Sequence, residues 1–446
     1  MHIHKNIIKM KTIFKLAVPL LLLPLIANSQ NTVNISGDSL TLNQILNEVI
    51  HNYPSIKKAQ TDLESSDAKI GLAKTAYLPN VDVAASYMLL GPTSTITLPG
   101  LGSFQMNPAS NYSAMLNVTE SIYDFGKTRK NIAYETQSRE LAGLSVEQLK
   151  QKLSGMMVGN FYSILFLQEA IKIKDEEMLT LKAHFNFVEK KEASGSATKY
   201  ELLTTKVRIS TNESQKTDLQ NALQIQLSQM NSFLGKSQDT KLKVKKELYA
   251  PEIMASNDSL FSYAFDHRNE IKVARQKTEL ANSRLGIVNA QNNPSLNFIG
   301  SAGFKNGYIP DLAKFTPNFV AGVSFKVPLF DANRSKYTKI QAQSEIKGNV
   351  QETDLTRRAI VNEVVESKAN AETALKKVNL SELQLEQAEQ AHALAETSFK
   401  AGVITNVELM YSYTAVTDSK LALLKTKIDY SVSLLKLKIA LGEQIY

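Results

Sequence analysis

Few side chains in this sequence have the types and spacing that chemistry requires. Gly235-Lys236-Ser237 matches the end of a phosphate-binding loop, in which backbone amides of a glycine-rich turn hold phosphate. However, Met230 occupies the position of the first glycine of that motif, and the segment follows an expected helix. A helix C-cap at Gly235 is therefore the better interpretation, because glycine readily adopts the left-handed backbone that ends many helices.

The histidines do not form a recognisable ligand set either. His51, His184, His267 and His392 are scattered without the short spacings of zinc sites, and no cysteine is present to complete one. The lack of cysteine also excludes a thiolate nucleophile, a disulfide and a lipidated cysteine. The sequence therefore predicts no catalytic residue, no cofactor and no metal site, and it favours a protein that is not an enzyme.

The elements that carry these residues should be few and long. The chain has 446 residues but only 19 Gly and 12 Pro, which is little turn-forming material for its length. From Leu409 to Leu441, apolar residues recur at alternating spacings of four and three, the heptad pattern of packed helices. Residues 127–190 and 333–398 contain no proline, so each could form a helix of about 96 to 99 Å. Shorter helices are expected over 200–235 and 259–291, and stacked end to end they would match one long helix.

The N-terminus has the features of a secretory signal peptide, residues 1–29. Four lysines without acidic partners precede an apolar stretch from Leu16 to Ile26, and small residues at Ala27 and Ser29 fit cleavage before Gln30. These lysines supply half of the formal charge of +8, so the charge gives no reason to expect nucleic acid as a partner. No other apolar run approaches the roughly 20 residues of a membrane-spanning helix.

The remainder of the chain repeats itself. Tyr53-Pro54-Ser55-Ile56 matches Arg268-Asn269-Glu270-Ile271 at an offset of 215, and Pro79 matches Pro294 at the same offset. Further matches at an offset of 207 pair Tyr123 with Phe330, Gly195 with Gly402, Glu201 with Glu408, and Leu234 with Leu441. The offset changes only between Pro79 and Tyr123, which indicates a loop of variable length inside a duplicated unit.

Four segments between the helices alternate with the period of a β-strand. Each is close to the ~9 to 11 residues of a tilted membrane strand, with one apolar side and one small or polar side. The apolar positions are Val81, Val83, Ala85, Tyr87, Tyr112, Ala114, Leu116, Val118, Leu296, Phe298, Ala302, Phe304, Phe319, Ala321, Val323, Phe325 and Val327. The connecting stretches, 89–111 and 306–317, are rich in glycine and proline and are expected to be surface loops.

Four strands cannot close a barrel. An open strand edge is not viable in lipid, because its amide and carbonyl groups would lack partners. We therefore expect several chains to pool their strands, and three chains would give 12, an even number within the range of outer-membrane barrels.

In the order and spacing of these features, the sequence resembles the TolC-like outer-membrane efflux protein family over nearly the whole mature chain. The resemblance rests on the internal duplication, on the strand-to-helix junctions Tyr123-Asp124-Phe125-Gly126 and Pro328-Leu329-Phe330-Asp331, and on Phe399-Lys400-Ala401-Gly402 followed by Val407-Glu408-Leu409. Asn333 stands where the family pattern has a glycine, and asparagine also tolerates left-handed backbone.

The resemblance implies a mostly α-helical protein with membrane β-strands. Long coiled-coil helices would form a periplasmic α-barrel, and two β-hairpins per chain would contribute to a 12-stranded outer-membrane barrel in a homotrimer. The expected segments are the signal peptide 1–29, entry helices 30–79, a first hairpin 80–126, a first long helix, tip turn, return helix and linker 127–258, a second entry helix 259–294, a second hairpin 295–332, and a second long helix, tip turn and return helix 333–446.

The family further implies a passive exit duct in the outer membrane, which works with a periplasmic adaptor protein and an inner-membrane transporter. The turns expected to dock on the adaptor are Gly195, Ser196, Ala197, Thr198, Gly402, Val403, Ile404 and Thr405. The expected periplasmic gate is Phe399, Ile404, Glu408 and Tyr411, where relatives often carry an ionic network. Glu408 has a second interpretation, since Thr405-x-x-Glu408 has the spacing of a capping box.

Two other functions fit part of the sequence. A non-transporting coiled-coil protein of the periplasm would account for the heptads but not for the alternating segments. A periplasmic adaptor would have a helical hairpin, but it would need a soluble β-rich domain. No pattern in the sequence selects a drug, a metal ion, a lipid or a protein as cargo.

Overall fold

The computed structural model describes residues 39–100, 102–248 and 256–446. The expected signal peptide, 1–29, and the start of the expected segment 30–79 lie outside the described residues. Eight α-helices and one short 3-10 helix are described, together with six strands. The helical elements are α1 (Leu42–Asn52), α2 (Pro54–Lys74), η1 (Thr75–Tyr77), α3 (Lys127–Ala193), α4 (Lys199–Leu234), α5 (Asn257–His267), α6 (Asn269–Ala290), α7 (Arg334–Lys400) and α8 (Asn406–Ala440).

The two long helices have the expected positions. Helices α3 and α7 contain 67 residues each, which corresponds to about 100 Å at 1.5 Å per residue. They begin at Lys127 and Arg334, within one residue of the predicted starts, and extend a few residues past the proline-free stretches used to predict them. The local pattern therefore placed both helices correctly.

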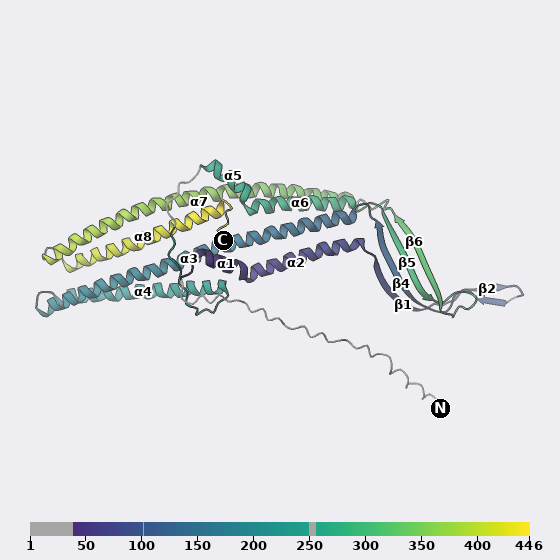
Figure 1. Ribbon diagram of the computed structural model, residues 1–446, viewed down its shortest axis with the longest axis horizontal. Helices are drawn as coiled ribbons and strands as arrows, with labels where there is room; N and C mark the ends of the chain where they lie inside the picture. Colours follow the sequence, from purple (N-terminus) through teal and green to yellow (C-terminus); the bar gives the residue numbers. More distant parts are fainter. Residues whose placement is uncertain (1–38, 101, 249–255) are drawn as a thin grey trace, which may run out of the picture. The chain divides into compact units, whose positions relative to one another are not determined.

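Shorter helices line the long ones. Helices α6 and α8 pack on α7, and helices α2, α4 and α6 pack on α3. Figure 1 shows α2 and α4 along different stretches of α3, and α6 and α8 along different stretches of α7. Helix α3 is enclosed near its middle, because Phe161, Tyr162, Ile164 and Leu165 on successive sides of it are all at most 1% exposed. The prediction of long helices paired with stacked short ones is confirmed for the described residues. The stacked pairs differ from the expected pair of 200–235 with 259–291, because α4 follows α2 along α3 and α8 follows α6 along α7.

The second entry helix, expected as one element over 259–294, is two helices. Arg268 has extended backbone between α5 and α6, and its side chain is buried. Its guanidinium donates to Glu270 (2.8 Å), to Glu363 of α7 (2.7 Å) and to the carbonyl oxygen of Ala440 at the end of α8 (2.9 Å). These bonds turn the side chain inward and fix the break where three helices meet, so tertiary contacts override the local helical pattern.

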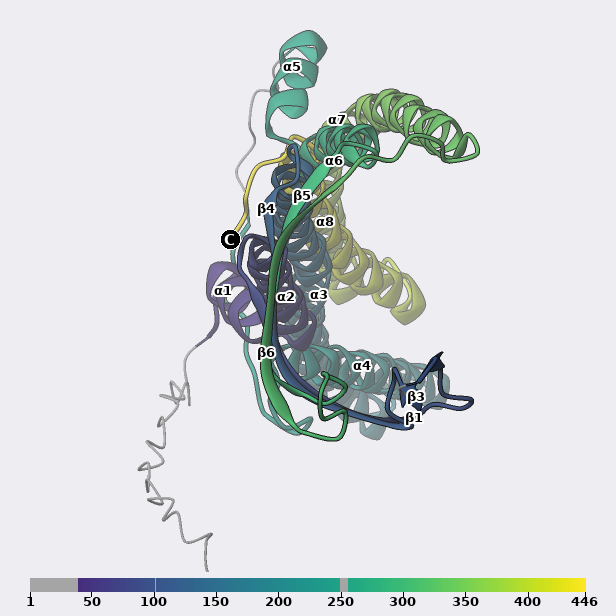
Figure 2. The same cartoon turned by 90° about the vertical axis from the view of Figure 1, so that its right-hand side faces the viewer.

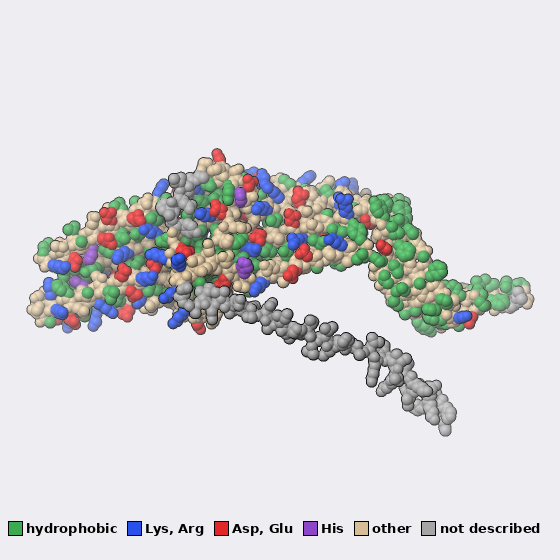
Figure 3. All heavy atoms as spheres, viewed as in Figure 1, with side chains coloured by type: hydrophobic (Ala, Val, Ile, Leu, Met, Phe, Trp, Pro, Cys, Tyr) green, Lys and Arg blue, Asp and Glu red, His purple; other side chains and the backbone are tan. Residues whose placement is uncertain are grey.

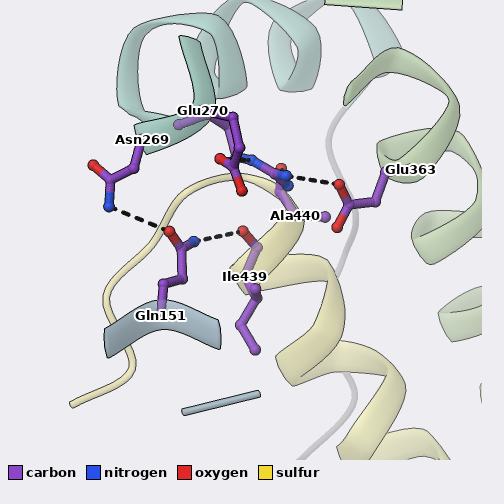
Figure 4. Close-up of polar contacts among 7 residues, drawn as sticks. Gln151, Asn269, Glu270, Glu363, Ile439 and Ala440 are labelled. Atoms are coloured by element: carbon purple, nitrogen blue, oxygen red, sulfur yellow. Dashed lines mark hydrogen bonds and ion pairs between the residues drawn. The ribbon is translucent and has the colours of Figure 1, made fainter. Parts of the chain in front are cut away.

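Neighbouring polar groups extend this junction, as Figure 4 shows. The side chain of Gln151 on α3 donates to the carbonyl oxygen of Ile439 (3.1 Å) and accepts from Asn269 (3.3 Å). Gly442 follows with φ +86°, and a Cβ there would lie 2.8 Å from the backbone nitrogen of Arg268. Glycine is therefore required where the end of α8 approaches the α5–α6 break.

Four strands form one antiparallel sheet in the order β1-β4-β5-β6. These are β1 (Asn80–Leu89), β4 (Ser110–Tyr123), β5 (Ser295–Lys305) and β6 (Thr316–Lys326). Directly paired residues of an antiparallel sheet lie on the same face. The register pairs Val83 with Leu116, Leu116 with Ala302, and Ala302 with Phe319. Every predicted apolar position within these strands follows the same parity, so all of them share one face; Val327 lies just beyond β6.

The two faces of this sheet differ in chemistry. On the apolar face, Val83 is 76% exposed and Phe319 is 81% exposed, so the described chain itself does not cover them. On the opposite face, Asn117 donates to Asp82 (2.9 Å), and the hydroxyls of Ser86 and Ser113 are 2.9 Å apart. Figure 3 shows hydrophobic side chains gathered over the strands, whereas charged side chains are spread over the helices.

One predicted loop contains a further pair of strands. Within the stretch 89–111, β2 (Thr95–Leu98) and β3 (Gly102–Gln105) form a separate two-stranded sheet. The alternating residues Thr95-Ile96-Thr97-Leu98 favour a strand, and Gly100 and Gly102 with positive φ provide the turn. The stretch was predicted to be a loop because it is rich in glycine and proline, and its short alternating segment was overlooked.

Both strand-to-helix junctions use left-handed backbone. Phe125 and Gly126 have φ of 52° and 89°, and Ala332 and Asn333 have φ of 54° and 63°. The expectation that Asn333 replaces a glycine in this conformation is confirmed. An aspartate precedes each pair. Asp124 accepts hydrogen bonds from the backbone N–H groups of Gly126 (2.9 Å) and Thr128 (2.6 Å), two groups at the start of α3 that have no partner within the helix.

Candidate functional site

The two helix-hairpin turns have the same backbone design. After α3, the N–H of Gly195 donates to the carbonyl oxygen of Glu192, and that of Ser196 donates to Lys191. After α7, Gly402 donates to Phe399 and Val403 donates to Ser398 in the same way. These paired bonds define a Schellman motif, which requires left-handed backbone at the glycine, and φ is +75° at Gly195 and +74° at Gly402.

The expected docking residues are mostly accessible in this chain. Six of the eight are exposed, while Ala197 and Ile404 are half-buried. Val403 is 77% exposed at the centre of the second turn. The structure thus places these eight residues together on the two turns, as the sequence predicted.

A side-chain cap begins each return helix. The hydroxyl of Thr198 accepts the N–H of Glu201 (3.2 Å), and the hydroxyl of Thr405 accepts the N–H of Glu408 (3.2 Å). In the second turn the carboxylate of Glu408 also accepts the N–H of Thr405 (2.7 Å), so the capping box is complete. These hydrogen bonds from the backbone and hydroxyl of Thr405 lower the pKa of Glu408, and the carboxylate is ionised at neutral pH.

The four expected gate residues do not form one cluster within the chain. Phe399 and Ile404 pack against the buried residues Leu181, Leu409 and Met410. In contrast, Tyr411 is 63% exposed, and the guanidinium of Arg208 on α4 lies 5.7 Å from its ring centroid. Glu408 is exposed in its capping box.

A buried polar contact that sequence reasoning missed joins the two hairpins beside these residues. The Nε2 atom of His184 on α3 lies 2.6 Å from Oδ1 of Asn406, the first residue of α8. The amide nitrogen of Asn406 donates to the carbonyl oxygen of Glu201 and to the hydroxyl of Thr205, both at 3.3 Å on α4. These donor contacts orient the amide, so Oδ1 accepts and the neutral imidazole carries its proton on Nε2.

His184 is buried among aromatic side chains. Its ring centroid is 5.6 Å from that of Phe399 and 6.1 Å from that of Tyr413. Burial disfavours the imidazolium and lowers the pKa of His184 from 6.5, although the hydrogen bond to Asn406 and the charge of Glu201 act in the opposite direction. Burial lowers the pKa of His392 as well, against the charge of Glu396.

Nothing local in the sequence could have paired His184 with Asn406, since 222 positions separate them. The matches of Gly195 with Gly402 and of Glu201 with Glu408 indicated only that the two turns correspond.

The described residues hold no group of three or more His, Asp or Glu side chains arranged for a metal ion. Gly235 ends α4 with φ +68°, which confirms the helix C-cap, and Lys236 forms an ion pair with Glu48 (3.2 Å). Among the described helices, none combines the length and apolarity needed to cross a membrane.

The fold is that of solved outer-membrane channels. VceC from Vibrio cholerae superposes with a TM-score of 0.73 at 18% identity, covering 91% of this chain and 97% of that one. The CmeC outer membrane channel of Campylobacter jejuni superposes with a TM-score of 0.74 at 16% identity, covering 91% of this chain and 87% of that one. The TM-scores, with coverage near 90% of both chains, establish a common fold.

The sequence pattern of the family described as outer membrane efflux protein matches residues 45–236 and 260–443, and the chain belongs to this family. Outer membrane protein TolC of Salmonella enteritidis is 18% identical over 430 residues, which cover 94% of this chain and 86% of the relative. Nodulation protein T of Rhizobium leguminosarum bv. trifolii is 18% identical over a region that covers 87% of this chain and 82% of the relative. The chain is thus an outer-membrane channel component of efflux systems, as its resemblance implied, and its relatives are channel proteins rather than enzymes.

Proposed function

We propose that three copies of this chain form a passive exit duct from the periplasm to the cell exterior. The observation that carries the proposal is the four-stranded sheet, which has an uncovered apolar face, a polar opposite face and two outer strands, β1 and β6. Pooling three sheets would give a 12-stranded barrel with lipid outside and a polar lumen inside. The long helices would continue as a periplasmic α-barrel.

The order of elements supports an internal duplication as the origin of this architecture. Each half has two entry helices, a strand pair, a long helix and a return helix. Tyr53 and Arg268, which the sequence repeat matches, have similar extended backbone between the two entry helices of their halves. The paired Schellman turns add to this correspondence.

Chemical crosslinking in native outer membranes tests the trimer. We expect linked species of up to three chains, because only pooled strands satisfy the backbone groups at the edges of β1 and β6. A chain that stays monomeric and stable in the membrane would contradict the proposal. It would also favour a different way of covering the strand edges.

A periplasmic adaptor and an inner-membrane transporter complete the proposed system, and the transporter supplies the energy. The adaptor would contact the two turns that carry Gly195 and Gly402. Their exposure supports this role. The alternatives, a structural coiled-coil protein or an adaptor, account for the helices but give the exposed apolar sheet no role.

Introducing Glu at Val403 should abolish efflux while leaving the trimer level unchanged. Val403 is highly exposed and has an ordinary negative φ, so the variant adds charge at the proposed adaptor contact without straining the turn. Ser196→Glu makes the matching change in the first turn. The measurements are outer-membrane trimer levels and export of a compound that cells with the unmodified chain expel and cells without it retain. Normal efflux from both variants, at normal trimer level, would remove the turns from the docking surface.

The gate is proposed to lie at the end of the duct that carries the two turns. There the turn ends of α7 and α8 from three copies would converge. Phe399, Ile404 and Tyr411 would then close the duct by apolar and aromatic packing, and Glu408 would add one acidic ring. The separation of Tyr411 from Phe399 within a chain is compatible with this closure only if different copies bring them together.

Channel recordings of the reconstituted trimer separate these gate roles. Glu408→Gln should weaken a preference for cations, since the ionised carboxylates would attract cations and repel anions. Phe399→Ala and Tyr411→Ala should each raise the resting conductance. Unchanged selectivity and conductance in all three variants, with normal trimer stability, would place the gate elsewhere.

A further inference from the structure

An amphipathic hairpin projects from the sheet end at which β1 stops. We call the paired strands β2 and β3, residues 95–98 and 102–105, the outer hairpin (Figures 1 and 2). Its register pairs Ile96 with Phe104 and Thr97 with Ser103, whose hydroxyls are 2.7 Å apart. Alternation therefore puts Ile96, Leu98 and Phe104 on one face, and the hydroxyl and amide side chains on the other.

The apolar face of the outer hairpin is uncovered in the described chain. Ile96 is 46% exposed, Leu98 is 44% exposed and Phe104 is 50% exposed. No charged side chain occurs between Asp82 and Glu120, so neither the hairpin nor its flanks offer a partner for charged headgroups. An apolar, uncharged protein surface suits this face better than water or an anionic lipid surface.

Two exposed apolar side chains, Tyr308 and Ile309, lie at the opposite edge of the same sheet end, in a stretch that also carries Asp311 and Lys314. The stretch 306–315 joins β5 to β6, and Ile309 there is 70% exposed. Buried Asn306 fixes the base of this stretch, since it accepts the N–H of Tyr112 (2.8 Å) and donates to the carbonyl oxygen of Ser110 (2.7 Å). Asn318 of β6 donates to the hydroxyl of Tyr308 (2.7 Å), which holds Tyr308 beside the outer strand.

Strand direction brings these two surfaces together in an assembly. Strand β1 runs toward this end of the sheet and stops at Leu89, whereas β6 starts there at Thr316 and runs away. When β1 of one copy pairs antiparallel with β6 of the next, Leu89 and Thr316 become neighbours. The outer hairpin of one copy then lies beside the stretch 306–315 of the adjacent copy.

We propose that the apolar face of the outer hairpin packs on Tyr308 and Ile309 of the neighbouring copy, joining adjacent chains at the outer rim. The inference rests on the proposed trimer. It assigns to a second copy of this chain a contact that is separate from the strand pairing. Burial of exposed apolar side chains on both partners drives the contact.

The absence of cysteine from the chain permits a direct test in the full-length protein. Two differently tagged chains are expressed together, one with Ile309→Cys and the other with Ile96→Cys, Leu98→Cys or Phe104→Cys. After oxidation in outer membranes, at least one pair should give a reducible dimer that carries both tags, because a disulfide requires close Cα atoms. The two tags exclude a link within one chain.

Matched controls place cysteine on the polar face of the same hairpin, at Thr97 or Gln105. We expect these controls not to link with Ile309→Cys. The inference is overturned if trimers form but no apolar-face pair links, or if the polar-face controls link equally well. Labelling of Phe104→Cys in whole cells by a membrane-impermeant maleimide identifies the alternative: rapid labelling of an unlinked hairpin means water, and slow labelling means lipid.

The trimer is measured separately, by amine crosslinking of the same membranes. Trimers without the rim link would overturn only the rim contact. A lack of trimers would overturn the proposed function, and the rim contact with it.

Discussion

Replacing Val323 with arginine should remove most of the trimer from the outer membrane, whereas arginine at Val320 should be tolerated. The two valines lie three residues apart on β6 and are similarly exposed, at 62% and 60%. Their register puts Val323 opposite Phe298 on the apolar face and Val320 opposite Ser301 on the polar face. The pair therefore differs chiefly in which face of the sheet receives the charge.

The expected size of this effect follows from the solvent on each side. Arginine on the lipid face of a membrane barrel costs about 2 to 4 kcal/mol near the bilayer midplane, and a trimer would carry three copies. Arginine in a polar lumen stays hydrated. Heat-modifiable trimer in outer membranes is measured on gels for both variants. Equal loss in the two variants, or loss only in Val320→Arg, would contradict the assigned faces.

Acidification should loosen the packed hairpin tips through His184. Because burial lowers the pKa of His184 below 6.5 in the packed tip, the packed tip binds fewer protons than a tip in which His184 is exposed to water. The packed tip is therefore most stable, as far as His184 is concerned, above about pH 6.5, the usual pKa of histidine. Its stability declines as the pH falls below that value. Resting conductance of the reconstituted trimer should rise in that range.

Substitutions separate the titration from the hydrogen bond. His184→Gln keeps an N–H donor for Asn406 but does not titrate, so the acid response should shrink while conductance at neutral pH stays low. His184→Ala leaves the buried oxygen of Asn406 without its donor, at a cost of about 1 to 3 kcal/mol, and should raise conductance even at neutral pH. The readout is conductance against pH for both variants.

The neighbouring ionisable groups set the controls for this experiment. Glu201 on α4 faces His184, Lys191 on α3 lies over the rings of Phe187 and Phe399, and His392 contacts Tyr413. His392→Gln tests a second, half-buried histidine of the same hairpin pair. His51→Gln changes an exposed histidine far along the chain and should leave the acid response intact. A full acid response in His184→Gln would show that another group titrates.

Much of this structure could be predicted from local periodicity in the sequence. The left-handed backbone at Asn333 was expected from the resemblance to the family, whose pattern has a glycine there. The start of α3 at Lys127 and the apolar side of each strand followed from spacing along the chain. Such features depend on residues a few positions apart, because helix and strand periods determine which side chains share a face. The same reasoning placed both tip turns at their glycines.

Contacts between distant residues decided the rest. The break at Arg268 depends on Glu363 and Ala440, which belong to other helices, and the contact of His184 with Asn406 joins two hairpins. Tyr411 lies over Arg208 and away from Phe399, although all three come from the tip region. A one-dimensional pattern records which face a residue occupies. Which partner lies across from that face is determined only when the helices pack, because packing brings together groups with no relation along the chain.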